Sequence, residues 1–147
     1  MNIFFDVDYT ILSQDNGLRP GTREVFRKLV DDGHQVYVWS GVGVRAAEVE
    51  QHGLQEYVEG VFQKPLQQFE EGLRTFGVTV RPDFVVDDYP EIVSAFGGVL
   101  IRPYLFRTPH DTEMEKVYSI VTEYSLRGSS EDSSFRPRSD GSGQKEE

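Results

Sequence analysis

The chain of 147 residues contains no cysteine, which excludes disulfide scaffolds, thiol nucleophiles and thiolate zinc sites. It is also poor in basic residues: 15 Lys and Arg stand against 25 Asp and Glu, so the formal net charge is −10. Extended nucleic-acid binding and attachment to an anionic membrane surface both need Lys and Arg, so neither is expected. No apolar run approaches the roughly 20 residues that span a bilayer, and no targeting segment is visible. We therefore expect a soluble, cytoplasmic protein.

The sequence does contain short apolar runs rich in β-branched and aromatic residues. They lie at residues 3–5, 35–39, 57–62, 84–86 and 99–101. Runs this short and this uniformly apolar are typical of strands buried on both faces of a parallel sheet. Apolar residues recur at helical spacing between the runs and again near residues 114–124. This alternation predicts an α/β fold: a three-layer, doubly wound domain with a mostly parallel five-stranded sheet.

The composition changes near the C-terminus. From residue 127 onward the chain is rich in Ser, Gly, Pro and charged residues, and Phe135 is the only large apolar group of its last 20 residues. Such a segment buries too little apolar surface to offset the entropy lost on ordering. We therefore predict one folded domain over residues 1–126 and a disordered polar tail over residues 127–147.

Polar residues follow four of the expected strands at the points where the strands end. They are Asp6, Asp8 and Thr10 after the first strand, Ser40 and Gly41 after the second, Lys64 after the third, and Asp87 and Asp88 after the fourth. Each of these residues alone is explained as a turn, a helix cap or a solvated lysine. Ligands of open α/β sheets bind outside the carboxyl ends of the strands, however. The ordered set therefore predicts a single polar site at this edge.

Four segments carry a more specific pattern: FDVDYTIL at 5–12, YVWSG at 37–41, Lys64, and VVDD at 85–88. In order and spacing, over residues 2–105, they resemble the four motifs of the haloacid dehalogenase (HAD) superfamily. Its members are phosphatases and phosphotransferases with an aspartate nucleophile. The resemblance implies a HAD-like Rossmannoid fold and a hydrolase that acts on a phosphoester.

The resemblance also implies roles for the four acidic residues. Asp6 would attack phosphorus and form an aspartyl-phosphate, and Asp8 would serve as general acid and then general base. Asp6, the backbone carbonyl of Asp8, Asp87 and Asp88 would hold Mg²⁺, because this ion prefers oxygen ligands. The second aspartate favours phosphoester chemistry, since a halide leaving group needs no acid.

The remaining motif residues are expected to bind the phosphoryl group. Lys64 would offset charge between nucleophile and phosphate, Ser40 and Gly41 would hold phosphate oxygens, and Thr10 would orient the first loop. Arg45 is a further candidate contact for phosphate or substrate. The residues expected to flank the pocket are Tyr9, Trp39, Val42, Arg45 and Tyr89.

Little sequence separates the motifs from the helices that follow them, so the sequence leaves no room for a cap domain. The resemblance is therefore to capless members, whose open sites accept bulky or macromolecular phosphoesters or are closed by a neighbouring subunit. We expect the partner to be a phosphorylated small molecule or a phosphoprotein. Homo-oligomers are compatible with such an open site.

Two alternatives to a phosphatase stay open. A phosphotransferase of the same family would use the same residues, and a non-catalytic, phosphate-responsive interaction module would keep the fold. A receiver-like signalling domain is disfavoured, because it needs an aspartate after the third strand, where this chain has only Lys64.

Three weaker signals are discounted. The segment GVGVRA at 41–46 matches a dinucleotide fingerprint but does not lie in the first strand-to-helix turn. The run that starts at Asp6 lacks the glycine and glutamate of a calcium loop. His34, His52 and His110 are isolated, and we expect them on the surface.

Overall fold

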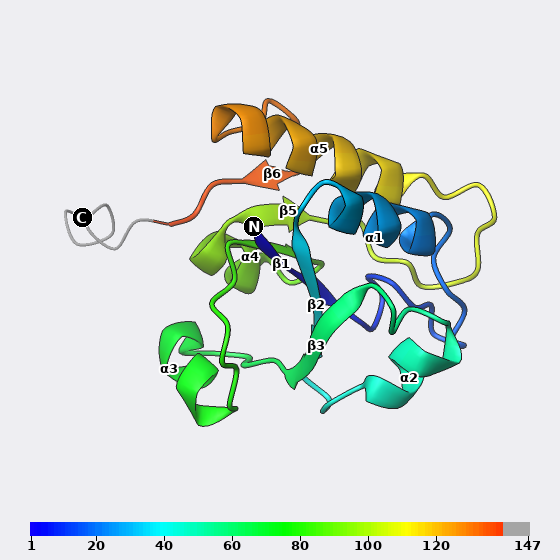
Figure 1. The fold of residues 1–147 in the computed structure, drawn as a ribbon, viewed down its shortest axis with the longest axis horizontal. Helices are drawn as coiled ribbons and strands as arrows, with labels where there is room; N and C mark the ends of the chain where they lie inside the picture. Colours follow the sequence, from blue (N-terminus) through cyan, green and yellow to red (C-terminus); the bar gives the residue numbers. More distant parts are fainter. Residues whose placement is uncertain (140–147) are drawn as a thin grey trace.

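The first strand of the sequence lies at the centre of the sheet. In the computed structural model, which describes residues 1–139, β1 (Asn2–Asp6) pairs in parallel with β2 (Gln35–Ser40) and β4 (Phe84–Asp87). β3 (Val58–Gln63) extends the sheet beyond β2, and β5 (Gly98–Leu100) extends it beyond β4. The strand order is β3-β2-β1-β4-β5-β6 (Figure 1), so the predicted mostly parallel α/β sheet is confirmed.

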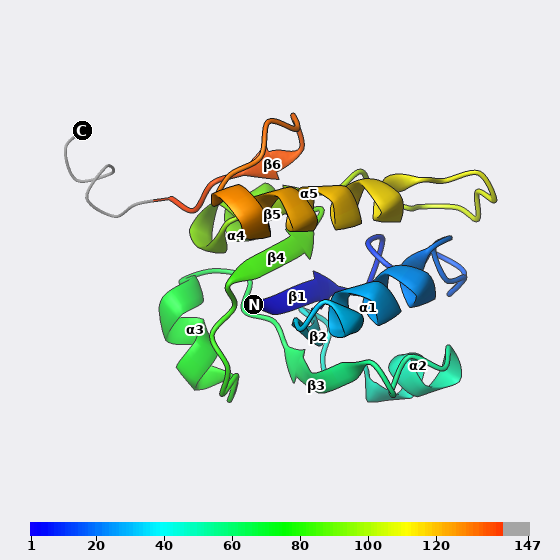
Figure 2. The ribbon, with the colours of Figure 1, turned by 45° about the horizontal axis from the view of Figure 1, so that its top comes forward.

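Helices cover both faces of the sheet and make three layers (Figure 2). On one face, α1 (Thr22–Asp31) and α5 (Glu113–Arg127) pack against the side of β1 that carries Ile3 and Phe5. On the other face, α3 (Phe69–Thr75) and α4 (Pro90–Phe96) pack against Phe4. Successive side chains of a strand point to opposite faces, so the apolar run at residues 3–5 supplies both cores.

Two parts of the secondary structure differ from the expectation. The helix α2 (Ala46–Gln51) follows β2, although only Val49 of this segment is buried. The sheet has six strands in place of five, because β6 (Phe135–Arg136) pairs antiparallel with β5. A six-residue helix with one buried apolar side chain shows too little periodicity to be predicted from the sequence.

The expected disordered tail is wrong for its first part. Gly128 ends α5 in the left-handed conformation (φ 76°), and the chain then returns to the sheet. The main chain of Phe135 pairs with Val99, and its ring centroid lies 5.5 Å from that of Tyr124 on α5. One aromatic side chain and a free sheet edge are therefore enough to order a polar segment. The rest of the expected tail, residues 140–147, lies outside the described residues.

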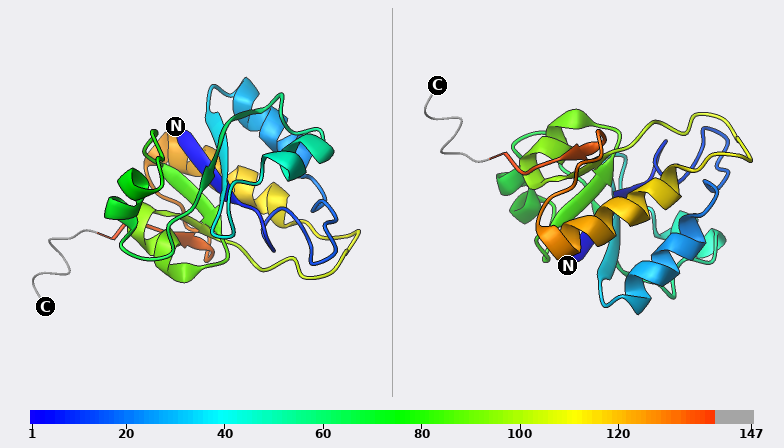
Figure 3. Two further views of the ribbon diagram at one scale, coloured as in Figure 1. Left: turned by 90° about the horizontal axis from the view of Figure 1, so that it is seen from below. Right: turned by 90° about the horizontal axis from the view of Figure 1, so that it is seen from above.

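Two long connections run side by side beyond the sheet (Figure 3). One joins β1 to α1 over residues 7–21, and the other joins β5 to α5 over residues 101–112. The amide of Tyr104 donates to the carbonyl of Tyr9 at 2.7 Å, and the amide of Gln14 donates to the carbonyl of Leu105 at 2.9 Å. No helix within residues 1–139 is both long enough and apolar enough to cross a bilayer.

Candidate active site

Three carboxylates meet where β1 and β4 end. Asp6 is the last residue of β1 and Asp87 the last of β4, and these strands are neighbours in the sheet. With Asp88 they form a group in which one carboxylate oxygen of each residue lies within 4.8 Å of the others. Asp6 and Asp87 are buried, whereas Asp88 is half-buried. Within residues 1–139 this is the one group of three or more Asp, Glu or His side chains so closely spaced.

Lys64 joins two of these carboxylates. Its Nζ lies 3.0 Å from Oδ1 of Asp6 and 2.9 Å from Oδ2 of Asp87. Lys64 follows β3 directly, and its amide donates to the carbonyl of Ser40 at the end of β2 (2.8 Å), which extends the pairing of the two strands by one step. The side chain is 5 % exposed, so the ammonium and the two carboxylates are desolvated together.

The charges of this cluster do not cancel, because it contains three carboxylates and one ammonium. Burial raises the pKa of Asp6 to about 8, and repulsion by Asp87 adds to the rise while Lys64 opposes it. Burial also raises the pKa of Asp87 to about 6, although Lys64 lowers it in part. Burial disfavours the charged form of Lys64, but attraction by Asp6 and Asp87 outweighs it and raises the pKa of the ammonium. The cluster therefore favours the binding of further positive charge.

Thr10 contacts the second oxygen of Asp6. Its Oγ1 donates to Oδ2 of Asp6 at 3.2 Å, and the Thr10 side chain is completely buried. The loop reaches this position through a tight turn in which the amides of Thr10, Ile11 and Leu12 all point at the carbonyl of Val7. Both carboxylate oxygens of Asp6 are thus held, one by Thr10 and one by Lys64.

Asp8 lies apart from the carboxylate cluster. Its Oδ2 accepts a hydrogen bond from Nη1 of Arg45 at 2.7 Å, and Nε of Arg45 lies 3.0 Å from Oε2 of Glu48. Arg45 directly precedes α2, and Glu48 lies in the first turn of that helix. The helix missed by the sequence prediction therefore places a guanidinium beside the expected general acid. Glu48 was not predicted as a site residue.

Ser40 and Gly41 form the start of the loop after β2. The Ser40 hydroxyl accepts a hydrogen bond from the amide of Val42 at 3.1 Å, so the hydroxyl and this amide lie together. A Cβ at Gly41 would lie 2.7 Å from Cδ2 of Leu66, which leaves no room there for a larger residue unless the Leu66 side chain moves. A larger residue at position 41 would therefore displace the exposed side chain of Leu66 from the loop after β2.

A cavity of about 450 Å³ opens beside Gly41 and Lys64. It lies between the loop after β3 and the outer side of α3. Its other lining residues are Gln63, Leu66, Gln67, Gln68, Glu71, Gly72, Arg74, Thr75 and Phe76. Because Lys64 lines this cavity, the non-phosphate part of a ligand bound at Lys64 would have space there.

The residues expected to flank the pocket differ in where the structure places them. Trp39 was predicted to flank the pocket, and this is wrong: its indole is fully buried between Phe4 and Phe96. Strand positions alternate between faces, so Trp39 points into the core while the chain continues to Ser40. Val42 and Tyr9 are exposed and Tyr89 is half-buried, and none of the three lines the cavity beside Lys64.

Sequence reasoning missed one buried ion pair beside the site. Arg19 is 1 % exposed, and its guanidinium forms two hydrogen bonds with Asp111. An Asp two residues before a predicted helix is a typical capping residue, and the Asp111 side chain does accept from the amide of Glu113. The pairing itself leaves no local signal, because the two residues are 92 positions apart.

The donor set fits a hard divalent cation. Three carboxylates with oxygens inside 4.8 Å offer the all-oxygen environment that Mg²⁺ prefers, and among residues 1–139 only one ammonium, that of Lys64, contacts them. A scan against protein-family models, a search of curated proteins and a search of solved structures each found no match for this chain. Its function is therefore inferred from the site alone.

Proposed function

We propose that the protein is a Mg²⁺-dependent phosphatase of the HAD type, without a cap domain, that hydrolyses a phosphoester through an aspartyl-phosphate. The observation that carries this proposal is the convergence of Asp6, Asp87 and Asp88 with Lys64 at the carboxyl edge of the sheet. Acidic residues are rarely buried unless they are paired with a positive charge, and both Asp6 and Asp87 are buried beside Lys64. A buried nucleophile, a cation and two further carboxylates at neighbouring strand ends match the needs of phosphoryl transfer.

Asp6, Asp87 and Asp88 would hold the metal ion through their carboxylates, together with the backbone carbonyl of Asp8. When bound, Mg²⁺ would neutralise charge on the phosphoryl oxygens and favour the ionised form of Asp6. Lys64 adds a positive charge at Oδ1 of Asp6. Ser40, Gly41 and the amide of Val42 would receive phosphate oxygens, and Arg45, which contacts Asp8, would contribute a charged donor.

In the first step a carboxylate oxygen of Asp6 attacks phosphorus. A bond forms between this oxygen and phosphorus while the bond from phosphorus to the leaving oxygen breaks. Asp8 gives a proton to the leaving alkoxide, which departs as an alcohol. Thr10 and Lys64 fix the carboxylate during the attack, since each holds one of its two oxygens.

In the second step Asp8 accepts a proton from water as the water oxygen attacks phosphorus. The bond between phosphorus and Asp6 breaks, and inorganic phosphate leaves with Asp6 and Asp8 returned to their starting states. A phosphotransferase would use the same residues, with an acceptor alcohol in place of this water. The partner class is the same for both: a phosphorylated small molecule or a phosphoprotein.

Two connections next to the site support the capless type, because neither is long enough to hold a domain of its own. The chain passes from β1 to α1 over residues 7–21, and the loop between β3 and α3 covers only residues 64–68. Neither segment contains a helix or strand of its own. A site bordered by such loops stays open to bulky substrates.

The test is a screen of aryl phosphates, metabolite phosphates and phosphopeptides, each with and without Mg²⁺. We expect turnover that depends on Mg²⁺ and falls by at least about 10³-fold in Asp6→Asn, because the nucleophile is lost. The matched control is Glu56→Gln, an exposed charge change away from the site.

Two outcomes would contradict the mechanism: an unchanged rate in Asp6→Asn, or full hydrolytic activity in Asp8→Asn. Absence of turnover at every Mg²⁺ concentration, with no binding of a phosphate analogue such as vanadate, would favour the non-catalytic interaction module.

A further inference from the structure

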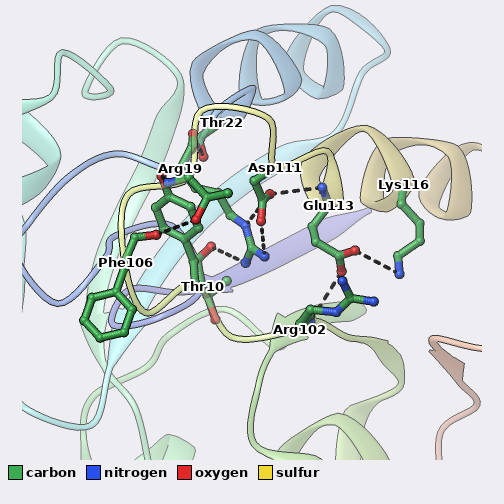
Figure 4. A network of polar contacts seen from close by, with 10 residues as sticks. Thr10, Arg19, Thr22, Arg102, Phe106, Asp111, Glu113 and Lys116 are labelled. Carbon is green, nitrogen blue, oxygen red and sulfur yellow. Dashed lines mark hydrogen bonds and ion pairs between the residues drawn. The ribbon is translucent and has the colours of Figure 1, made fainter.

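Arg19 is a charged residue in the interior of the protein, and two of its three guanidinium nitrogens contact one partner, Asp111. Its Nε lies 2.8 Å from Oδ1 of Asp111 and its Nη2 lies 3.0 Å from Oδ2 (Figure 4). The Arg19 side chain has no exposed surface, and that of Asp111 is 13 % exposed. The two residues come from the connections 7–21 and 101–112, so the pair joins the two long loops beside the site.

The third nitrogen of the Arg19 guanidinium points at the loop that carries the proposed catalytic residues. Nη1 donates to the carbonyl oxygen of Thr10 at 3.1 Å, as Figure 4 shows, and the amide of Arg19 donates to the carbonyl of Ile11 at 2.7 Å. Thr10 in turn donates through Oγ1 to Oδ2 of Asp6. A continuous series of hydrogen bonds therefore runs from Asp111 through Arg19 and Thr10 to Asp6.

A second contact from the 101–112 connection acts on the same loop. The ring of Tyr104 lies 5.1 Å from the guanidinium carbon of Arg19, and its amide donates to the carbonyl of Tyr9 at 2.7 Å. Tyr9 adopts a positive φ of 67°, a conformation that a bulky residue seldom takes unless its surroundings impose it. The loop is thus held from both sides in a turn it would not favour alone.

Stability alone gives a weak reason for this arrangement. Replacing a buried ion pair by apolar residues of similar size is often neutral or stabilising. The free energy needed to desolvate the two charges offsets most of the attraction between them. Unlike apolar residues, the ion pair provides a hydrogen-bond donor, Nη1 of Arg19, that points at the Thr10 carbonyl. Displacing a nucleophile by a fraction of an ångström lowers the reaction rate markedly. The rate therefore depends on a fixed orientation of the Asp6 carboxylate.

We infer that Arg19 and Asp111 are positioning residues, which set the orientation of the Asp6 carboxylate by fixing the loop of Thr10. This inference rests on the proposed function as far as it concerns catalysis. The restraint on the loop is a separate, physical claim, and it has a readout that needs no activity.

The main test is the double variant Arg19→Met/Asp111→Leu, which removes both charges and keeps the interior filled. We expect a melting temperature close to that of the unchanged protein, kcat reduced about 100-fold and KM within about twofold. Amide hydrogen exchange at residues 9–12 should become faster by about tenfold or more, because the loop loses its restraint. The matched control is Arg27→Met/Asp31→Leu, which removes an exposed ion pair on α1 and should change none of these values.

Single conservative variants keep the test decisive if the double variant does not fold. Asp111→Asn keeps the shape and one acceptor oxygen, and Arg19→Lys keeps the charge but only one donor group; each should lower kcat about tenfold and leave KM unchanged. Unchanged kcat and unchanged exchange in a folded variant would overturn the inference. If the unchanged protein shows no turnover, the proposed function fails, and the exchange rates alone decide whether Arg19 restrains the loop.

Discussion

The guanidinium of Arg45 lies 2.7 Å from the carboxylate of Asp8, the residue proposed as general acid and base. Glu48 takes another donor of the same guanidinium at 3.0 Å. In this state Arg45 is shared between two carboxylates, and an incoming phosphate would compete with both for its donors. Arg45 therefore connects substrate binding to the freedom of Asp8.

Replacing Arg45 by Gln should weaken substrate binding more than it slows the chemical steps. One charge-assisted hydrogen bond contributes about 1.5–3 kcal/mol, which corresponds to an increase in KM of roughly 10- to 100-fold. Steady-state kinetics with an aryl phosphate would measure the effect, with Arg23→Gln on α1 as the control. An unchanged KM would show that Arg45 does not contact the phosphate.

The metal-free protein should lose stability as the pH rises. In the unfolded chain Asp6 and Asp87 titrate near 3.8, whereas in the fold burial raises their pKa values to about 8 and about 6. The folded state then binds protons more tightly than the unfolded state. This tighter proton binding stabilises the fold fully below pH 4, and the stabilisation is lost as the pH rises through 6 and 8. Lys64, whose pKa is raised from 10.5, titrates above this window.

Thermal unfolding in EDTA between pH 5 and pH 9 tests this dependence. The melting temperature should fall across the range in the unchanged protein and fall less in Asp6→Asn, which has no charge to bury. At pH 8 the variant should be the more stable by about 1–2 kcal/mol, or roughly 3–8 °C. Parallel pH profiles for the two proteins would contradict the assignment of the raised pKa to Asp6.

Mg²⁺ should reverse the loss of stability. At 100 times its dissociation constant a ligand stabilises the folded state by about 2.7 kcal/mol, which is roughly 5–10 °C in melting temperature for a domain of this size. The increase should be larger at pH 8 than at pH 5, because protons compete for the same carboxylates.

The location of the Mg²⁺ site is tested with the variants Asp87→Asn and Asp88→Asn, with Glu56→Gln as the control. Each of the two aspartate variants should lose most of the shift produced by Mg²⁺. A shift of the same size in all four proteins would place the bound ion elsewhere.

The C-terminal segment should contribute to the stability of the sheet. Removing the Phe135 ring deletes its contact with Tyr124 and its packing against the core, so Phe135→Ala should cost about 1–2 kcal/mol. Leu126→Ala, which truncates an exposed side chain 81 % accessible to solvent, should cost close to nothing. Denaturant titration would measure both; equal midpoints would mean that β6 adds nothing to the stability of the fold.

Much of the fold follows from the sequence because strands of a parallel sheet are buried on both faces. The runs at residues 3–5 and 84–86 therefore appear as continuous apolar segments, and each predicts its strand. The meeting of Asp6, Lys64 and Asp87 follows from the same topology, since parallel strands end at a common edge. The proximity of these three residues was thus predictable from the order of strands and polar residues in the sequence.

What could not be predicted depends on contacts between distant loops. The pairs Arg19–Asp111 and Arg45–Asp8 span 92 and 37 positions and involve no regular periodicity. The strand β6 contains a single large apolar residue in a polar segment, and only the presence of a free edge on β5 gives it a partner. In each case the deciding information is the arrangement of other parts of the chain.

The central place of β1 in the sheet has a consequence for how the protein forms during synthesis. β1 leaves the ribosome before the other strands of the sheet, yet Ile3 pairs with Phe84, so one of its two neighbours is made only about 80 residues later. Pairing between such distant segments is slow, because a large loop must close before any contact compensates for it. Until then the carboxylate of Asp6 has neither Asp87 nor Asp88 beside it. A nascent chain that ends before β4 would therefore lack two of the three carboxylates of the proposed metal site, and the site would be completed late.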